Sequence, residues 1–183
     1  MAVDTRVRVG SVELAHAVMT ASGTSGHGAE LGAYFDLSEI GAVVVKSLSV
    51  MPWVGNPSPR LHPLPHGMIN AVGLQGPGVA AWFEEHLDSL ARQGARTVVS
   101  LWGRSVDEYR QAAEVVAGRL RSPGAEHVVA VEVTLSCPNL EGRRGIFAHD
   151  ATVSAEVVEA CRVIGRPLWA KLSPNTDRLV EVA

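Results

Sequence analysis

The feature that most constrains the fold is an alternation of short apolar, β-branched segments with longer segments of helical periodicity. The segment 41–46 reads Gly-Ala-Val-Val-Val-Lys, a continuous run typical of a strand covered on both faces. Regular alternation of strand and helix predicts parallel strands joined by helical crossovers. We expect strands at 17–21, 41–46, 97–101, 128–133 and 167–172, and helices at 31–38, 79–92, 105–121, 152–164 and from 177 onward.

Turn and cap residues predict several smaller features. Residues 7–14 contain two short valine-rich segments around Gly10-Ser11, which predicts a small N-terminal hairpin. Ser105 is followed three residues later by Glu108, the pattern of a capping box at a helix start. Thr152 is expected to begin and cap a later helix. Residues 51–77 are rich in proline and predict a long irregular loop with one small hairpin, and loops of this length are usually functional.

Two architectures fit the alternation: an open doubly wound sheet and a (β/α)₈ barrel. Polar and glycine-rich segments follow the C-terminal ends of the strands, where barrel active sites form. Residues 23–28 lack the GxGxxG spacing of a dinucleotide-binding sheet. These points favour an α/β TIM barrel. Because a complete barrel takes about 250 residues, we expect residues 1–183 to form one partial barrel domain, truncated after about five β/α units.

Composition excludes several classes of function. The net charge is −3 and the basic residues are scattered, which argues against nucleic acid as a partner. No apolar run approaches the ~20 residues that span a bilayer, and the first ten residues do not resemble a signal peptide. The two cysteines lie in different contexts, and no CxxC, HExxH or Cys/His cluster occurs. We therefore expect a cytoplasmic protein with no membrane segment and no metal.

Two lysines follow predicted strands at corresponding places. Lys46 ends the strand at 41–46, and Lys171 lies near the end of the strand at 167–172. In a barrel both would point toward the mouth, and together they indicate an anionic ligand. A lysine that extends into solvent, or a structural ion pair, is the alternative for each.

Two loops carry further candidate groups. Residues 67–78 form a loop of small residues in which Asn70 offers both a donor and an acceptor to a planar ligand, although the loop taken alone favours a turn-rich connector. Cys137 precedes Pro138, whose fixed φ holds the thiol on a stiff turn. Such a thiol can be a nucleophile or a base, or only a small buried side chain. Cys161 lies within a predicted apolar helix, and we assign it no role.

Five motifs in this order closely resemble the class 1 dihydroorotate dehydrogenases, over essentially the whole chain. The form Asn-Ala-Val-Gly-Leu-Gln is similar to the catalytic subunit of subgroup 1B. The motifs are Ala21-Ser22-Gly23-Thr24, Lys46-Ser47, Asn70 to Gln75, Ser136-Cys137-Pro138-Asn139, and Lys171-Leu172-Ser173-Pro174-Asn175.

The resemblance implies FMN as cofactor and dihydroorotate as substrate, oxidised to orotate in pyrimidine biosynthesis. Cys137 would remove the proton at C5 while hydride passes from C6 to the flavin, a role that suits a thiol with an unperturbed pKa of ~8.5. Residues 143–149 would belong to a mobile loop over the site. The implied flavin contacts are Ser22, Lys46, Ser47, Ser100, Thr134 and Lys171, and the implied substrate contacts are Lys46, Asn70, Ala71, Val72, Gly73, Leu74, Thr134 and Asn139.

Three positions depart from the family pattern. Thr134 and Ser100 stand where the family usually has asparagine, and Gly76 replaces the asparagine before Pro77. A hydroxyl has one donor and a shorter reach than an amide. A related FMN barrel reductase, such as a dihydropyrimidine dehydrogenase-like enzyme, is therefore a second hypothesis, and a non-catalytic barrel remnant is a third.

The resemblance also implies partners. Subgroup 1B catalytic subunits pair with an iron–sulfur flavoprotein subunit that carries FAD, and pass electrons to NAD; fumarate or another acceptor stays open. A homo- or hetero-oligomer is expected. Because the FMN phosphate site of such barrels follows strands 7 and 8, the 183-residue polypeptide is expected to bind FMN poorly and to be inactive alone.

Overall fold

A four-stranded parallel sheet forms the centre of the molecule. The computed structural model describes residues 3–136 and 146–183. The strand order is β3 (Val43–Val44), β6 (Thr97–Leu101), β7 (Val128–Thr134) and β8 (Leu168–Lys171). Among the strands of this sheet, each one lies beside the strand that precedes it along the chain. A doubly wound sheet reverses its order at a switch point, so this sequential order confirms the barrel-type arrangement.

The segment 17–21, expected as a strand, joins this sheet through a single bridge between Met19 and Ala42. Thr20 explains why the ladder does not continue. Its side-chain Oγ1 accepts the backbone N–H of Val44 at 2.8 Å, in the place of a backbone carbonyl. The segment therefore runs beside β3 without becoming a regular strand.

The helices follow the predicted ranges with two differences. The expected helix at 79–92 is divided at His86 into α1 (Val79–Glu85) and α2 (Leu87–Arg92). The expected helix at 31–38 is instead two 3₁₀ turns, Glu30–Ala33 and Leu37–Glu39, because Asp36 has extended backbone angles and its side chain caps the second turn. The remaining elements are α3 (Val106–Arg119), the 3₁₀ turn Ala125–His127, the 3₁₀ turn Phe147–His149, α4 (Ala151–Cys161), the 3₁₀ turn Arg162–Ile164 and α5 (Leu179–Val182).

The caps of α4 and α3 differ in part from those expected. Asp150, not Thr152, is the cap of α4, and its carboxylate accepts the N–H of Val153 at 3.1 Å. Ser105 caps α3 by accepting the N–H of Glu108, as predicted. The Glu108 carboxylate, however, accepts the N–H of Arg104 at 2.7 Å, one residue before the position that a capping box requires.

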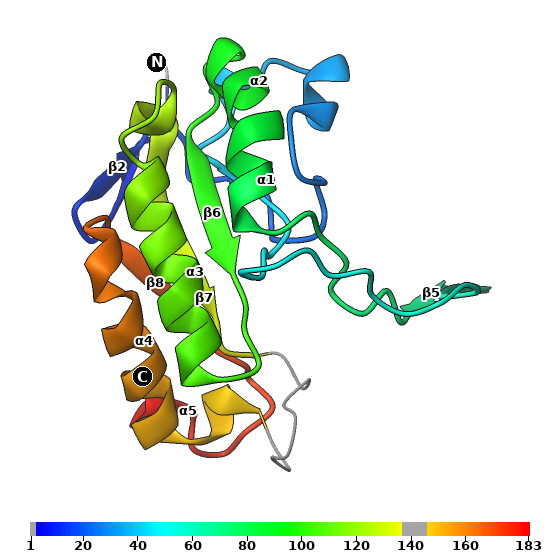
Figure 1. Cartoon of the computed structure of the whole chain (residues 1–183). Helices are drawn as coiled ribbons and strands as arrows, with labels where there is room; N and C mark the ends of the chain where they lie inside the picture. Colours follow the sequence, from blue (N-terminus) through cyan, green and yellow to red (C-terminus); the bar gives the residue numbers. More distant parts are fainter. Residues whose placement is uncertain (1–2, 137–145) are drawn as a thin grey trace.

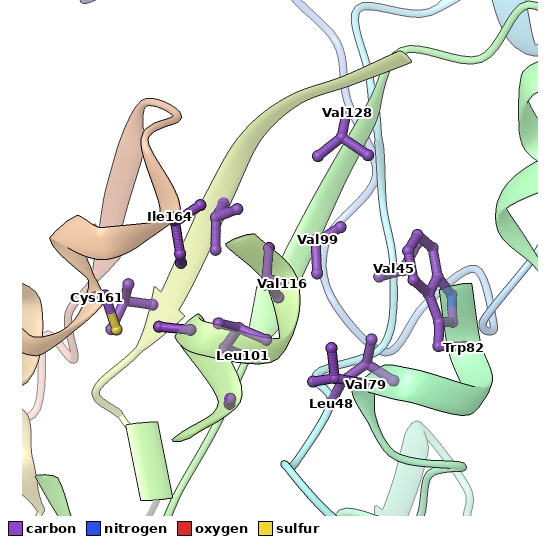
Figure 2. Packing of buried hydrophobic residues seen from close by; sticks show 14 of the residues in the cluster. Val45, Leu48, Val79, Trp82, Val99, Leu101, Val116, Val128, Cys161 and Ile164 are labelled. Atoms are coloured by element: carbon purple, nitrogen blue, oxygen red, sulfur yellow. The ribbon is translucent and has the colours of Figure 1, made fainter. Parts of the chain in front are cut away.

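Side chains of the central sheet alternate between two faces. One face carries Val99, Leu101 and Val133, and packs against α1 to α4 in the main hydrophobic core (Figure 2). The opposite face carries Val44, Val98 and Ala130, which pack under the N-terminal hairpin of β1 (Val7–Val9) and β2 (Val12–Leu14). We call this second face the inner face, since it corresponds to the interior of a barrel.

An extra residue between β3 and β6 changes which side chains reach the inner face. Val44 pairs with Val98, but the next pairing is Leu48 with Leu101, so four steps on one strand oppose three on the other. This is the count of a β-bulge, which reverses the alternation beyond it. Leu48 consequently lies in the main core, and Ser47 faces the inner side.

The long loop contains the one small hairpin expected there, β4 (Leu61–Leu64) paired with β5 (Gly67–Asn70). Every residue of both strands is exposed, and Figure 1 shows the hairpin projecting away from the sheet and its helices. In the part of the chain that the structure describes, no helix is both long and apolar enough to cross a membrane.

Candidate active site

Hydroxyl groups from four separate segments meet on the inner face at the C-terminal ends of the strands. Ser47 Oγ lies 2.7 Å from Ser22 Oγ, 2.9 Å from Ser100 Oγ and 3.3 Å from Thr134 Oγ1. Ser100 and Thr134 are 3.1 Å apart. Ser47, Ser100 and Thr134 are all buried. The bulge places Ser47 in this group, and the ends of β6 and β7 supply the other two hydroxyls.

Glu132 is the acceptor to which these hydroxyls connect. Its Oε1 accepts from Ser100 Oγ at 2.6 Å and from Lys171 Nζ at 2.7 Å, and lies 3.4 Å from Thr134 Oγ1. The Glu132 side chain is only 13% exposed, against 35% for Lys171. A carboxylate buried to this degree needs a cation or several donors, and here it has both. Lys171 is thus an ion-pair partner of Glu132, which is one of the alternatives that the sequence left open.

Lys46 lies beside this group but faces another direction. Its backbone N–H donates to Gly26 O at 2.9 Å. Within the residues that the structure describes, its ammonium makes no hydrogen bond or ion pair. It lines a cavity of about 550 Å³ together with His27, Trp53, Val72 and His86. A free ammonium in such a cavity can receive an anionic group.

His27 is the titratable group most affected by this cavity. Burial lowers the pKa of its imidazole, and the neighbouring His86 and Lys46 lower it further. Its Nδ1 is buried and has no hydrogen-bond partner among the described residues. The ring is therefore a neutral imidazole at neutral pH. Sequence reasoning did not single out His27, because its environment comes from segments far away in the chain.

The predicted substrate loop divides into an exposed and a cavity-facing part. Asn70 ends β5 and is exposed, as is Ala71. Val72 lines the cavity beside Lys46, while Gly73 and Leu74 are half-buried. The backbone of Gly73 has φ +74°, a left-handed conformation that glycine adopts without strain, and Asn56 lies 2.8 Å from where a Cβ would be.

Trp53 connects this loop to the end of β6. Its Nε1 donates to Gly73 O at 3.0 Å. Its ring meets Trp102 edge-on with centroids 5.8 Å apart, and the Arg104 guanidinium lies 5.1 Å from its centroid. Aromatic and cation–π contacts of this kind add to the packing of the loop. The sequence analysis missed Trp53 as a loop anchor.

The structure thus brings together Ser22, Ser47, Ser100, Thr134 and Lys171, five of the residues expected to contact flavin, and adds Glu132 to them. Lys46 adjoins that group, and Val72 adjoins Lys46. Asn70 makes no contact with the group within the described residues. Cys137 and Asn139 lie outside the described residues, as do residues 143–145 of the expected mobile loop. A second cavity, of about 760 Å³, lies between α3 and α4 on the helix side of the sheet, not on the inner face.

Cys161 occupies the place expected of a structural cysteine. It is fully buried in the main core, of which Val116 and Leu101 are also members (Figure 2). Burial raises the pKa of its thiol to about 12. A thiol of this kind is unreactive.

A sequential parallel sheet with polar side chains gathered at its strand ends defines a (β/α)-barrel protein with a site at the barrel mouth. A sequence model described as dihydroorotate dehydrogenase matches residues 5–183. The chain belongs to the dihydroorotate dehydrogenase family.

Curated relatives give the same family and a finer resemblance. The chain is 40% identical over 181 residues to "Dihydroorotate dehydrogenase B (NAD(+)), catalytic subunit" of Geotalea uraniireducens, covering 98% of this chain and 57% of the relative. It is 42% identical over 184 residues to the protein of the same name from Desulforudis audaxviator, covering 100% of this chain and 58% of the relative. The chain therefore spans a little over half the length of these relatives.

A solved structure supports the fold. The dihydroorotate dehydrogenase of Eimeria tenella, solved in complex with ferulenol, superposes with a TM-score of 0.74 at 18% identity, over 98% of this chain and 56% of that one. At this identity the likeness bears on the fold alone. It agrees with the partial barrel expected from the alternation of strands and helices.

Proposed function

We propose that this chain supplies flavin- and substrate-binding residues of an enzyme that oxidises dihydroorotate to orotate in pyrimidine biosynthesis. One observation carries the proposal: five residues expected to contact the flavin meet in one hydrogen-bonded group on the inner face, at the C-terminal ends of the strands. That is where barrel active sites form. The family match supports the same conclusion.

The donor set of the described residues fits FMN. The match to the dihydroorotate dehydrogenase family supports the flavin that the sequence resemblance implies. The flavin ring carries both N–H and C=O groups, and the group around Ser47 offers hydroxyls, a carboxylate and the Lys171 ammonium. FMN, when bound, supplies a hydride acceptor. The protein's contribution is to hold the ring and the substrate in register and to move the proton.

Lys46 is proposed to receive the carboxylate of dihydroorotate. Its ammonium has no partner within the described part of the chain, and Val72 lines the same cavity. Asn70 and Asn139 are proposed as further substrate contacts, which requires the projecting hairpin to close over the bound substrate. Loop closure of this kind excludes water from a reacting centre.

Cys137 is proposed as the base that removes the C5 proton. A thiolate is favoured by nearby cations, which lower the pKa of a thiol. Ser136, the last described residue before Cys137, lies two residues after the end of β7. The last residue of β7, Thr134, pairs with Lys171.

A chimera tests this function directly. This chain would replace the matching part of the G. uraniireducens catalytic subunit, and orotate formation would be followed by its ultraviolet absorbance with an artificial electron acceptor. We expect the chimera to oxidise dihydroorotate, and the 183-residue chain alone to be inactive. A folded, flavin-loaded chimera that leaves dihydroorotate unchanged would contradict the proposal.

Dihydropyrimidine reduction or oxidation is the second candidate. It is favoured by the hydrogen bonds of Thr134 and Ser100, whose hydroxyls are engaged with Ser47 and Glu132 and replace longer amide side chains. The same chimera assayed with dihydrouracil separates the two functions. A rate with dihydrouracil above that with dihydroorotate would support the second candidate.

An electron-transfer partner is also proposed. The relatives' name contains both "catalytic subunit" and NAD(+), which indicates a second subunit and a nicotinamide acceptor for those proteins. For this chain we propose an iron–sulfur flavoprotein partner that carries FAD, within a cytoplasmic hetero-oligomer. Dihydroorotate-dependent NADH formation by the chimera, with and without the G. uraniireducens partner subunit, tests it.

A further inference from the structure

The first turn of α3 binds the segment that follows β6 through a compact ion pair. The Glu108 carboxylate accepts from Arg104 Nε at 2.9 Å, from Arg104 Nη2 at 2.6 Å and from the backbone N–H of Arg104 at 2.7 Å. A Cβ at Gly103 would lie 3.1 Å from Glu108 Cβ, so the segment and the helix are closely packed here. Charge-assisted hydrogen bonds of this kind fix the position and the orientation of the guanidinium.

The guanidinium in turn contacts the ring of Trp53. Its Cζ lies 5.1 Å from the centroid of that ring, within the range of a cation–π interaction. Only 30% of the Arg104 side chain is exposed, which strengthens the interaction relative to a fully hydrated cation. Trp102, which is buried, meets the same ring edge-on. The Trp53 ring is therefore held by a cation and by a buried aromatic side chain.

Trp53 fixes the backbone of the predicted substrate loop at two places. Its Nε1 donates to Gly73 O at 3.0 Å, and its backbone N–H and C=O both pair with Gly76 at 2.9 Å. Leu74, between these two glycines, has φ +61°, a left-handed conformation that costs free energy in a residue with a Cβ. This part of the loop therefore needs contacts from elsewhere in the chain to keep its conformation.

The same turn of α3 also contacts the end of β7. Tyr109, the residue after Glu108, is buried, and its hydroxyl donates to Thr134 O. One helical turn, capped by Ser105, thus contacts both the segment that holds Trp53 and the strand end from which the chain continues to Cys137.

We propose that Arg104 is a positioning residue, which acts through Trp53 to fix the backbone at Val72 and Gly73 relative to Lys46. Trp53, Val72 and Lys46 line one cavity, so a displaced Trp53 ring changes where the loop backbone lies relative to the ammonium. The first turn of α3 is then a common anchor for the substrate loop and the end of β7. For the anionic ring that enters the cavity, the inference rests on the proposed function.

Hydrogen–deuterium exchange of the chain, read by mass spectrometry of its peptides, tests this anchor without any ligand. We expect Arg104→Gln to accelerate exchange at 53–56 and 71–76 by about tenfold, the effect of one shielded cation–π contact. Exchange in β6 and β7 should stay within about twofold of the unchanged chain, whereas a general loss of stability would accelerate it there as well.

Two further variants serve as controls. Arg110 lies on the same helix and pairs with Asp107 at 2.8 Å, but its side chain is half-exposed. Arg110→Gln therefore removes a guanidinium and an ion pair outside the contact with Trp53, and should leave exchange in the loop unchanged. Arg104→Lys keeps a cation near the ring and should restore part of the protection.

A double-mutant comparison tests whether Arg104 acts through Trp53. Trp53→Leu removes the ring, so adding Arg104→Gln to it should accelerate loop exchange by less than about twofold more. Trp53→Phe keeps a ring but loses the N–H donor, so Arg104→Gln should keep most of its effect in that background. If the effects of Arg104→Gln and Trp53→Leu multiply, Arg104 acts independently of the ring and the inference is overturned.

The chimera gives a readout at the level of the reaction. We expect Arg104→Gln to raise KM for dihydroorotate about tenfold while kcat changes less than about threefold, because the loop that binds substrate is displaced and the reacting groups are not. Arg104→Lys should recover part of the loss, and Arg110→Gln should leave both constants unchanged. An active chimera with an unchanged KM in Arg104→Gln would overturn the inference.

Unchanged loop exchange in Arg104→Gln, or equal acceleration in the loop and the sheet, would also overturn it. If Arg104→Gln does not fold, Glu108→Gln makes the same measurement, since it weakens the hold on the guanidinium and leaves the guanidinium in place. The two proposals fail separately. A folded chimera without turnover contradicts the proposed function, while the exchange of the chain still decides whether Arg104 anchors the loop.

Discussion

His27 gives the clearest pH-dependent property at the scale of single residues. Its pKa in the folded chain lies below the ordinary value of 6.5, chiefly because the ring is buried. The unfolded chain therefore binds the proton more tightly than the folded chain. The contribution of the neutral His27 ring to the free energy of unfolding is fully present above about pH 6.5. It is lost as the pH falls from there through the lowered pKa of the folded chain.

We expect the free energy of unfolding to decrease between neutral pH and pH 5, and His27→Gln to reduce that slope. Urea unfolding at a series of pH values measures it. His62→Gln is the matched control, since His62 is exposed on the projecting hairpin. An unchanged slope in His27→Gln would show that the ring titrates normally in the folded chain.

Cys161 gives a second prediction about a single side chain. Because burial raises the pKa of its thiol to about 12, it is neither ionised nor accessible at pH 8. Iodoacetamide at pH 8 should leave Cys161 unmodified in the native chain and modify it in denaturant, as read by peptide mass spectrometry. Rapid native labelling of Cys161 would mean that the core around α4 opens readily.

The sequence motifs predicted several residues of the hydrogen-bonded group on the inner face, but not Glu132, the acceptor to which the hydroxyls connect. The sequence pattern indicated Ser22, Ser47 and Lys171 through their motifs. It gave no reason to select Glu132, because a single glutamate within an apolar strand is consistent with either face. The role of Glu132 depends on the register between β7 and β8, where Thr134 pairs with Lys171, and this register is a tertiary property.

Among the elements, the start of α4 allows a sharp comparison of two caps. Asp150 accepts the N–H of Val153, whereas Thr152 is an exposed residue inside the helix. Asp150→Ala should lower the free energy of unfolding by about 1 kcal/mol through loss of the cap. Thr152→Ala should change it by less than about 0.5 kcal/mol, as for an ordinary surface position.

Urea unfolding of the two variants measures the difference. A larger loss in Thr152→Ala than in Asp150→Ala would restore the original sequence interpretation. Both positions lie outside the main core, so the comparison reports on the cap and not on packing.

Four of the five expected strands form the sheet, whereas the segment 17–21 does not become a regular strand and the short helical turns were not predicted. Continuous β-branched runs such as 97–101 can hardly form anything except buried strands, and β6 has these bounds. The 3₁₀ turns at 30–39 depend on a local cap at Asp36, and the break at His86 interrupts an otherwise regular helical pattern. The bulge that places Ser47 has no signal in the sequence, because it appears only in the pairing of β3 with β6.

At the scale of the whole molecule, the order of the strands in the sheet is the feature that defines the class of fold. Sequential parallel strands leave all crossovers on one side, since such connections are right-handed. The opposite face is then free to form a barrel interior, with the N-terminal hairpin at one end and the polar group at the other. The alternation in the sequence predicted this class of fold, and the order of the sheet confirmed it.

The described sheet corresponds to part of a closed barrel. The sheet has four strands, whereas a closed barrel has eight. The curated relatives are correspondingly longer than the matched region. The chimera with a relative is for this reason the form in which the proposed catalysis can be measured.

Cys137 is the proposed base of dihydroorotate oxidation, and the pH–rate profile of Cys137→Ser in the chimera tests this role most directly. A hydroxyl is a far weaker base than a thiolate at neutral pH. We predict that orotate formation falls by at least about a hundredfold at pH 7 and recovers in part at high pH, while bound flavin is retained. An unchanged rate at pH 7 would contradict the account.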